Sequence, residues 1–376
     1  MNKLQKNTVY KRQTGLTLIE IMVALTISLI LLGGVYTIYI STKTSYKTQE
    51  GLSRVQENAR FALDMLSRNL RVAGLLGCDS KGSNIKINNI AKPESGQSSD
   101  SVTYLGDNNA IKGFRNPDAA DLTELGLNAG QVKADTDVIQ VRYVSDADCQ
   151  VNDRDVENAN IKVVNTCEVL QNEVVLVSDC SDGDLFRVTN VVTGNGGERT
   201  IAHASSGNTT NRLSKQYGSD AALLVFNNDI YFIGTGASGD DALFKRSLIN
   251  GTPTDQEIVD GVENMQVLYG IDDDGDATPN QYVALASVPT KNGEKDFSVV
   301  KSVRIALLLH TTSTAGNVYG NPTSGDVAPQ KQPFLDVPFF LTSNKTSEPV
   351  AGDFATPNDR RLRRVFTTTI KLRNRL

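Results

Sequence analysis

Few residues in this 376-residue sequence have the types and spacing that catalysis requires. The two histidines, His203 and His310, leave little material for a multi-histidine metal site or a histidine-based triad. No segment resembles a nucleophile elbow, a Walker loop or a zincin motif. We therefore assign no catalytic residues and interpret the protein as a non-enzyme.

An acidic segment offers the oxygen ligands that calcium prefers. Asp272, Asp274 and Asp276 alternate along the chain, with Asn280 close behind. The pattern departs from an EF-hand, because Gly275 stands at the fourth position and Val283 takes the place of the bidentate glutamate. The sequence favours a solvated hairpin turn rich in Asp and Gly, with bound Ca²⁺ as the alternative.

The cysteines indicate disulfides. Four are present, at Cys78, Cys149, Cys167 and Cys180. Zinc is disfavoured, because no close Cys-x-x-Cys pair exists and His203 is remote. Three pairings are open, and we favour Cys149 with Cys167 and Cys78 with Cys180. That arrangement nests a local loop inside a bridge between a helix end and a sheet.

Basic residues gather at the C-terminus. They are Arg360, Arg361, Arg363, Arg364, Lys371, Arg373 and Arg375. These side chains could contact the phosphates of a nucleic acid. Phe366, however, is the only aromatic residue nearby that could stack on a base, and the alternation of side chains along the predicted strand places it on the buried face. The net charge of -5 provides no global positive field. Nucleic acid is thus an unfavoured partner, and we expect a charged strand edge that blocks aggregation or docks another protein.

The N-terminal segment predicts a membrane anchor. Four basic residues and no acid precede residues 16–40, a largely apolar segment whose length suits a bilayer core. This charge distribution places the N-terminus in the cytoplasm and the chain beyond Ile40 outside. The segment is too long for a secretory signal peptide and lacks a small-residue cleavage site. Glu20 lies within it, at a cost of about 2.5 to 3.5 kcal/mol, and therefore requires a partner.

The residues Gly15-Leu16-Thr17-Leu18-Ile19-Glu20 resemble the processing site of type IV prepilins. The resemblance implies that a prepilin peptidase removes residues 1–15 as a leader, cleaving between Gly15 and Leu16, and that Leu16 is N-methylated. The family more often has Phe at the first mature position. Cleavage would create a buried amine on Leu16, which the Glu20 carboxylate of a neighbouring subunit can neutralise. Glu20 would then set the stagger between subunits.

A second helical pattern follows the membrane segment. Apolar residues recur at spacings of three or four over residues 41–77, with charged residues between them, which predicts an amphipathic helix ending near Gly74 and Gly77. A single helix from Leu16 to Gly74 would be roughly 90 Å long at 1.5 Å per residue. We expect its second half to pack on its own globular domain. Gly33, Gly34 and Gly51 are possible points of bending, and a separate anchor and surface helix is the alternative.

Residues 78–376 read as one globular domain. The composition, with 39% hydrophobic and 22% charged residues, excludes a collagen-like, wholly disordered or multi-span chain. Alternating short runs predict antiparallel strands and an α+β fold, with the long helix across the sheet and long loop insertions at Lys81 to Ala134, Gly194 to Ser219 and Thr311 to Pro357. The expected strands are Asp137–Val144, Glu173–Val177, Phe186–Val192, Leu223–Ile233, Met265–Tyr269, Val299–Leu309 and Val365–Leu372. We expect Val299–Leu309 to be central, because both of its faces are apolar.

Two later segments are similar to the PilW-type minor pilins. They are EIVDGVENMQVLYG with IDDDGDATPNQYV (residues 257–283), and RRLRRVFTTTIKLRNRL at the C-terminus. The resemblance implies the type IV pilin fold and a low-abundance subunit that primes pilus assembly. Its implied partners are other minor pilins, the major pilin, a large tip adhesin, the prepilin peptidase, the inner-membrane assembly platform and the lipid bilayer. The resemblance also implies a single-pass inner-membrane protein with a periplasmic domain that later becomes part of an extracellular pilus.

Two other functions compete with this interpretation. A minor pseudopilin of type II secretion would have the same kind of N-terminal segment and would differ mainly in its globular domain. A pilus-tip module that binds a surface or DNA through its long loops is the second.

Overall fold

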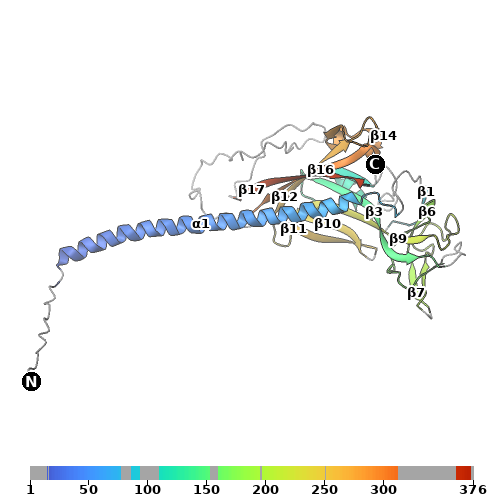
Figure 1. Ribbon diagram of the computed structural model, residues 1–376, viewed down its shortest axis with the longest axis horizontal. Coiled ribbons are helices and arrows are strands. Elements are labelled where there is room, and N and C mark those ends of the chain that lie inside the picture. The colour runs from blue at the N-terminus through green and yellow to red at the C-terminus, as the bar shows by residue number, and fades with distance from the viewer. Residues whose placement is uncertain are drawn as a thin grey trace, which may run out of the picture.

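A single long helix dominates the computed structural model, which describes residues 15, 17–77, 86–93, 110–152, 160–194, 197–249, 251–311 and 361–373. Helix α1 (Leu18–Arg71) has 54 residues (Figure 1) and is therefore about 80 Å long. It runs without a break through Gly33, Gly34 and Gly51, so the continuous helix is confirmed. The chain leaves the helix at Gly74 and Gly77, whose positive φ values suit glycine.

The strands after α1 form the head, which we define as the described residues from β1 to β17. Its largest sheet has eight strands, in the order β1-β6-β5-β9-β10-β11, with β3 pairing to β9 and β2 to β3. These strands are β1 (Lys86–Asn89), β2 (Ile111–Arg115), β3 (Asp137–Gln150), β5 (Val174–Ser178), β6 (Asp182–Arg187), β9 (Ala222–Thr235), β10 (Asp241–Ile249) and β11 (Thr252–Asp260). All these pairs are antiparallel except β1 with β6.

A four-stranded antiparallel sheet provides the second layer. Its order is β13 (Gln281–Val283), β12 (Val262–Ile271), β16 (Val300–His310) and β17 (Arg363–Lys371). A three-stranded sheet of β4 (Asn160–Val163), β8 (Arg199–Ala202) and β7 (Asn190–Thr193) lies at the end of the head far from the N-terminus (Figure 1). The short elements are α3 (Ala119–Leu125), β14 (Thr290–Lys291), β15 (Glu294–Lys295) and the 3₁₀ turns Leu285–Ser287 and Phe297–Val299.

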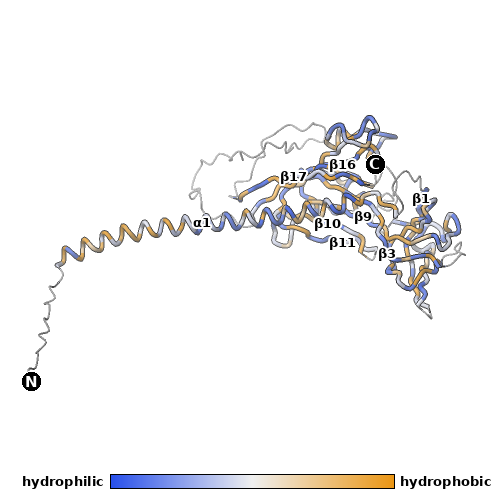
Figure 2. Tube along the Cα trace, viewed as in Figure 1, coloured by the Kyte–Doolittle hydropathy of each residue, from blue (hydrophilic) through white to orange (hydrophobic). Residues whose placement is uncertain are grey.

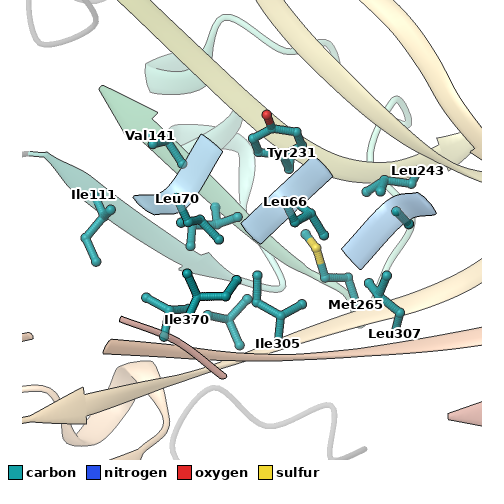
Figure 3. Packing of buried hydrophobic residues seen from close by; sticks show 14 of the residues in the cluster. Leu66, Leu70, Ile111, Val141, Tyr231, Leu243, Met265, Ile305, Leu307 and Ile370 are labelled. Atoms are coloured by element: carbon teal, nitrogen blue, oxygen red, sulfur yellow. The ribbon is translucent and has the colours of Figure 1, made fainter. Parts of the chain in front are cut away.

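The main core forms where the second half of α1 meets both large sheets. Leu66 and Leu70 of the helix are fully buried. Figure 3 shows them between Val141, Tyr231 and Leu243 of the eight-stranded sheet and Met265, Ile305, Leu307 and Ile370 of the other. Burying each leucine contributes roughly 1.5 to 3 kcal/mol. The α+β prediction, with the helix packed on antiparallel strands, is confirmed.

The sequence placed most long strands correctly but missed several shorter ones. β16 is internal, between β12 and β17, as predicted. The predicted strand Phe186–Val192 is wrong, because this apolar run ends β6, turns, and begins β7. The predicted loop 81–134 contains β1, β2 and α3, and the predicted loop 194–219 contains β8. Apart from Thr311, the predicted loop 311–357 lies outside the described residues.

Candidate functional site

Glu20 lies in the first turn of α1, where its carboxylate caps the helix. Its Oε2 accepts hydrogen bonds from the backbone N–H of Thr17 at 2.9 Å and from the Thr17 hydroxyl at 2.8 Å. The Thr17 hydroxyl oxygen in turn accepts the Glu20 N–H at 3.4 Å, which completes a capping box. Gly15 is exposed, and Leu16 lies outside the described residues. The carboxylate is thus held beside the chain segment in which processing is predicted to create an amine.

The first half of α1 is an apolar surface that nothing in the described chain covers. Its most hydrophobic 18-residue window has a mean hydropathy of 2.4 and no buried residues. Figure 2 shows that this half is coloured mainly as hydrophobic and projects from the head. Large side chains such as Leu25, Leu29 and Leu32 are exposed throughout. Such a surface needs lipid or protein around it.

Polar contacts fix the second half of α1 to the eight-stranded sheet. The Asn69 side-chain amide donates a hydrogen bond to the Tyr231 hydroxyl of β9. Asn58 Nδ2 donates to the Asp260 carbonyl at 3.2 Å, and the Gly74 N–H donates to the Arg142 carbonyl at 2.9 Å. The head and the second half of the helix therefore move as one body, and displacement of the helix displaces the head.

A buried carboxylate connects the two large sheets. Asp137 begins β3, and its Oδ2 accepts the N–H of Val267 in β12 at 2.9 Å. The residue keeps some exposed surface, but its carboxyl group is enclosed by protein. This desolvation raises the pKa of Asp137 to about 7, although the Val267 hydrogen bond and the charge of Arg115 act in the opposite direction.

Replacing Asp137 with Asn should remove a pH dependence of stability. The folded-state pKa of Asp137, about 7, exceeds the unfolded value of about 3.9, so its stabilising contribution is complete below about pH 4 and lost as pH rises to 7. The loss is on the order of 4 kcal/mol. Asn still accepts the Val267 N–H and does not titrate. Denaturant unfolding in detergent should therefore show Asp137→Asn more stable than wild type at pH 8 and similar at pH 4. The same difference in stability between variant and wild type at pH 8 and at pH 4 would contradict this prediction. Asp64→Asn, on the exposed surface of α1, is the control.

A disulfide joins Cys149 at the end of β3 to Cys167, which is the local pairing that we favoured. Both residues are buried in a second core that includes Ile161, Phe186 and Ile201. Cys180 is also disulfide-bonded, and Cys78, its expected partner, lies outside the described residues. The described cysteines are therefore unavailable as zinc ligands.

The double variant Cys149→Ser/Cys167→Ser should destabilise the end of the head far from the membrane helix. The bridge closes a loop with a sequence separation of 18 residues. In the chain-entropy model such a loop contributes about 3 kcal/mol. Denaturant unfolding under oxidising conditions measures the loss. Wild-type stability of the double variant would show that the bridge contributes nothing.

The acidic segment forms the turn between β12 and β13. The carboxylate oxygens of Asp272, Asp274 and Asp276 lie within 4.8 Å of one another. Asp272 accepts the N–H groups of Gly275 at 2.7 Å and Ala277 at 3.0 Å. Burial pushes the pKa of Asp272 upward, but these hydrogen bonds outweigh it, so the pKa lies below its ordinary value. The carboxylates thus stabilise the turn itself, as the favoured interpretation requires.

Calcium titration discriminates the two interpretations of this turn. Because the carboxylate oxygens already accept hydrogen bonds within the turn, we expect no binding heat at millimolar Ca²⁺ by isothermal titration calorimetry. Saturable heat that disappears in Asp274→Asn would instead support the calcium hypothesis.

The C-terminal arginines do not form a uniform charged edge. The described members Arg364, Lys371 and Arg373 are exposed, as predicted. Arg363, however, forms a buried ion pair with Glu263 at 2.6 Å, and Arg361 pairs with Asp240 at 2.7 Å. For these two residues the prediction of a solvent-exposed edge is wrong. Arg360 and Arg375 lie outside the described residues.

The comparisons with known proteins match both ends of the chain. Residues 230–374 match the family model described as Type IV Pilus-assembly protein W, PilW. Residues 10–36 match the prokaryotic N-terminal methylation motif, which includes Gly15, Leu16 and Glu20. A solved type IV-like pilin from Thermus thermophilus is similar at 16% identity, covering 55% of this chain and 85% of that one, with a TM-score of 0.21. No curated protein matches the chain significantly.

Proposed function

We propose, from the premise that this chain is a type IV pilin-like protein of the PilW kind, that it is a minor pilin which primes pilus assembly. It acts at or near the pilus tip, in complex with other minor pilins. The observation that carries the proposal is the uncovered apolar half of α1, joined without a break to a half that is locked into the head. A chain built this way can be stored in a bilayer and then moved into a filament as one rigid piece.

Processing prepares the subunit for this transfer. In our proposal the prepilin peptidase cleaves between Gly15 and Leu16, and Leu16 is then N-methylated. Residues 16–40 stay in the inner membrane with the head in the periplasm. During assembly the amine of Leu16 on one subunit pairs with Glu20 of its neighbour, so that neither charge is left alone in an apolar environment. The assembly platform, the major pilin and a large tip adhesin are the other proposed partners.

Gene deletion tests the priming role. Cells lacking the chain should lose surface pili, and the full-length gene should restore them, as counted by electron microscopy. Pili at normal number with lost adhesion would overturn priming and favour a tip-binding module. Normal pili with lost export of folded proteins would favour a type II secretion pseudopilin.

A further inference from the structure

Strand β2 has an open edge. Within the described chain it pairs with β3 alone. Asn116, one residue beyond β2, donates its N–H to the Thr136 carbonyl at 3.1 Å, so the backbone groups of the even-numbered residues face β3. Alternate residues of an antiparallel strand direct their backbone groups to opposite sides. The N–H and C=O groups of Gly113 and Arg115 therefore face away from β3, and no backbone group of the described residues pairs with them.

A groove lies beside this open edge. Its volume is about 350 Å³, and residues 112–115 of β2 line it together with parts of α3 and of the segment 285–297. Phe114 and Phe297, whose side chains are largely buried, contribute apolar surface. Four strand residues span about 13 Å at 3.3 Å per residue. The groove therefore has room for a few residues of an extended chain beside β2.

Arg115 brings a positive charge that is not satisfied locally. The other two cations of the groove are held, because Lys112 pairs with Glu124 and Lys295 donates to two backbone carbonyls at 2.6 and 2.9 Å. No hydrogen bond or ion pair with another described residue holds the Arg115 guanidinium. Its charge acts on Asp137, but burial raises the pKa of that carboxyl to about 7, so Asp137 is only partly ionised at neutral pH.

The acids of the groove leave the Arg115 charge in place. Glu124 is already paired with a lysine. Asp121 accepts the Asp118 N–H at 3.0 Å in the N-terminal cap of α3. Glu294 is exposed on the β14-β15 hairpin, where water solvates it. The groove thus offers three features to one occupant, namely unpaired backbone groups, apolar surface and a guanidinium suited to a carboxylate.

We propose that the groove beside β2 receives an extended segment of another pilin, which adds to the sheet as a further strand and places a carboxylate against Arg115. The inference rests on the proposed function, because the proposed complex puts the heads of other minor pilins beside this one. Backbone groups of the segment pair with the outward groups of Gly113 and Arg115. In such strand addition the main chain supplies affinity and the side chains supply specificity.

Photo-crosslinking from the groove of the full-length protein in piliated cells tests the inference. Ala286 lines the groove, whereas the next residue, Ser287, does not, and both are exposed. With p-benzoylphenylalanine at position 286, mass spectrometry should find crosslinks to a head segment of another pilin that contains Asp or Glu. The probe at position 287 is the matched control and should give few. Crosslinks from position 286 to a non-pilin or only within the chain itself, or none while a probe at Leu25 crosslinks to neighbours, would overturn the inference.

Two variants of Arg115 test the charge and the backbone separately. Arg115→Ala should lower the crosslink yield from position 286 about tenfold, because a hydrogen bond to a charged group is lost. Arg115→Pro should lower it further, since proline also removes the outward N–H while keeping the ladder to β3. Wild-type yield in Arg115→Ala would refute the carboxylate contact. Equal yields in the two variants would refute strand addition, and denaturant unfolding checks that both remain folded.

The same strains separate this inference from the proposed function. Normal pili in cells lacking the whole gene would refute the priming role. Lost pili in that strain, together with wild-type crosslink yields in both Arg115 variants, would refute the groove as a docking site alone.

Discussion

Replacing Glu20 with Gln should leave the protein in the membrane and abolish its incorporation into filaments. The amide keeps the size of the side chain but loses the charge that, in our proposal, neutralises the neighbour's Leu16 amine. A buried amine without a counter-charge costs several kcal/mol, which is enough to reduce assembly a hundredfold or more. Immunoblots of sheared pili and of membrane fractions measure the two pools.

A matched control distinguishes this effect from a general loss of helix charge. Glu50→Gln removes a carboxylate from the same helix, where it forms an exposed pair with Arg54. We expect that variant to assemble normally, because exposed pairs contribute about 0 to 1 kcal/mol. Incorporation of Glu20→Gln at the wild-type level would contradict the proposed role of Glu20.

Replacing Glu263 with Ala should destabilise the head more than any other single change considered above. Glu263 is the extra residue at a bulge in β12, between Val262 and Asn264, and it reaches Arg363 at the start of β17. Both side chains are at least nine-tenths buried. Removing Glu263 takes its carboxylate away from a buried guanidinium, and breaking a buried pair in this way typically costs about 3 to 5 kcal/mol.

Denaturant unfolding measures this cost. The exposed pair supplies the control, since Glu50→Ala should cost less than about 1 kcal/mol. Because Glu263 holds the strand that follows residues 312–360, we also expect β17 to become sensitive to protease in Glu263→Ala. A loss below about 1 kcal/mol would show that water compensates Arg363.

The sequence predicted elements whose signals are local. The apolar segment, the amphipathic spacing and the glycines after the helix define α1, and the alternation from Val303 to Leu309 marks a central strand. The capping box was missed, although Thr17-Leu18-Ile19-Glu20 has the Thr-x-x-Glu pattern that predicts one. The hairpin of β10 and β11 was also missed, although Asn-Gly at positions 250 and 251 is a strong turn signal.

The features that sequence could not predict depend on contacts between distant segments. Asp137 looks like any acid at a strand end, and its raised pKa arises from burial of the carboxyl group in the folded protein. The ion pair of Glu263 and Arg363 likewise joins strands that β16 separates, so no local pattern signals it.

The mature N-terminus of the protein from purified pili tests the central claim most directly. The proposed charge pair exists only if cleavage exposes an amine four residues before Glu20. N-terminal sequencing with intact-mass measurement should find a chain that begins at Leu16 and carries one methyl group. A chain that begins at Met1, or at any residue other than Leu16, would contradict the account.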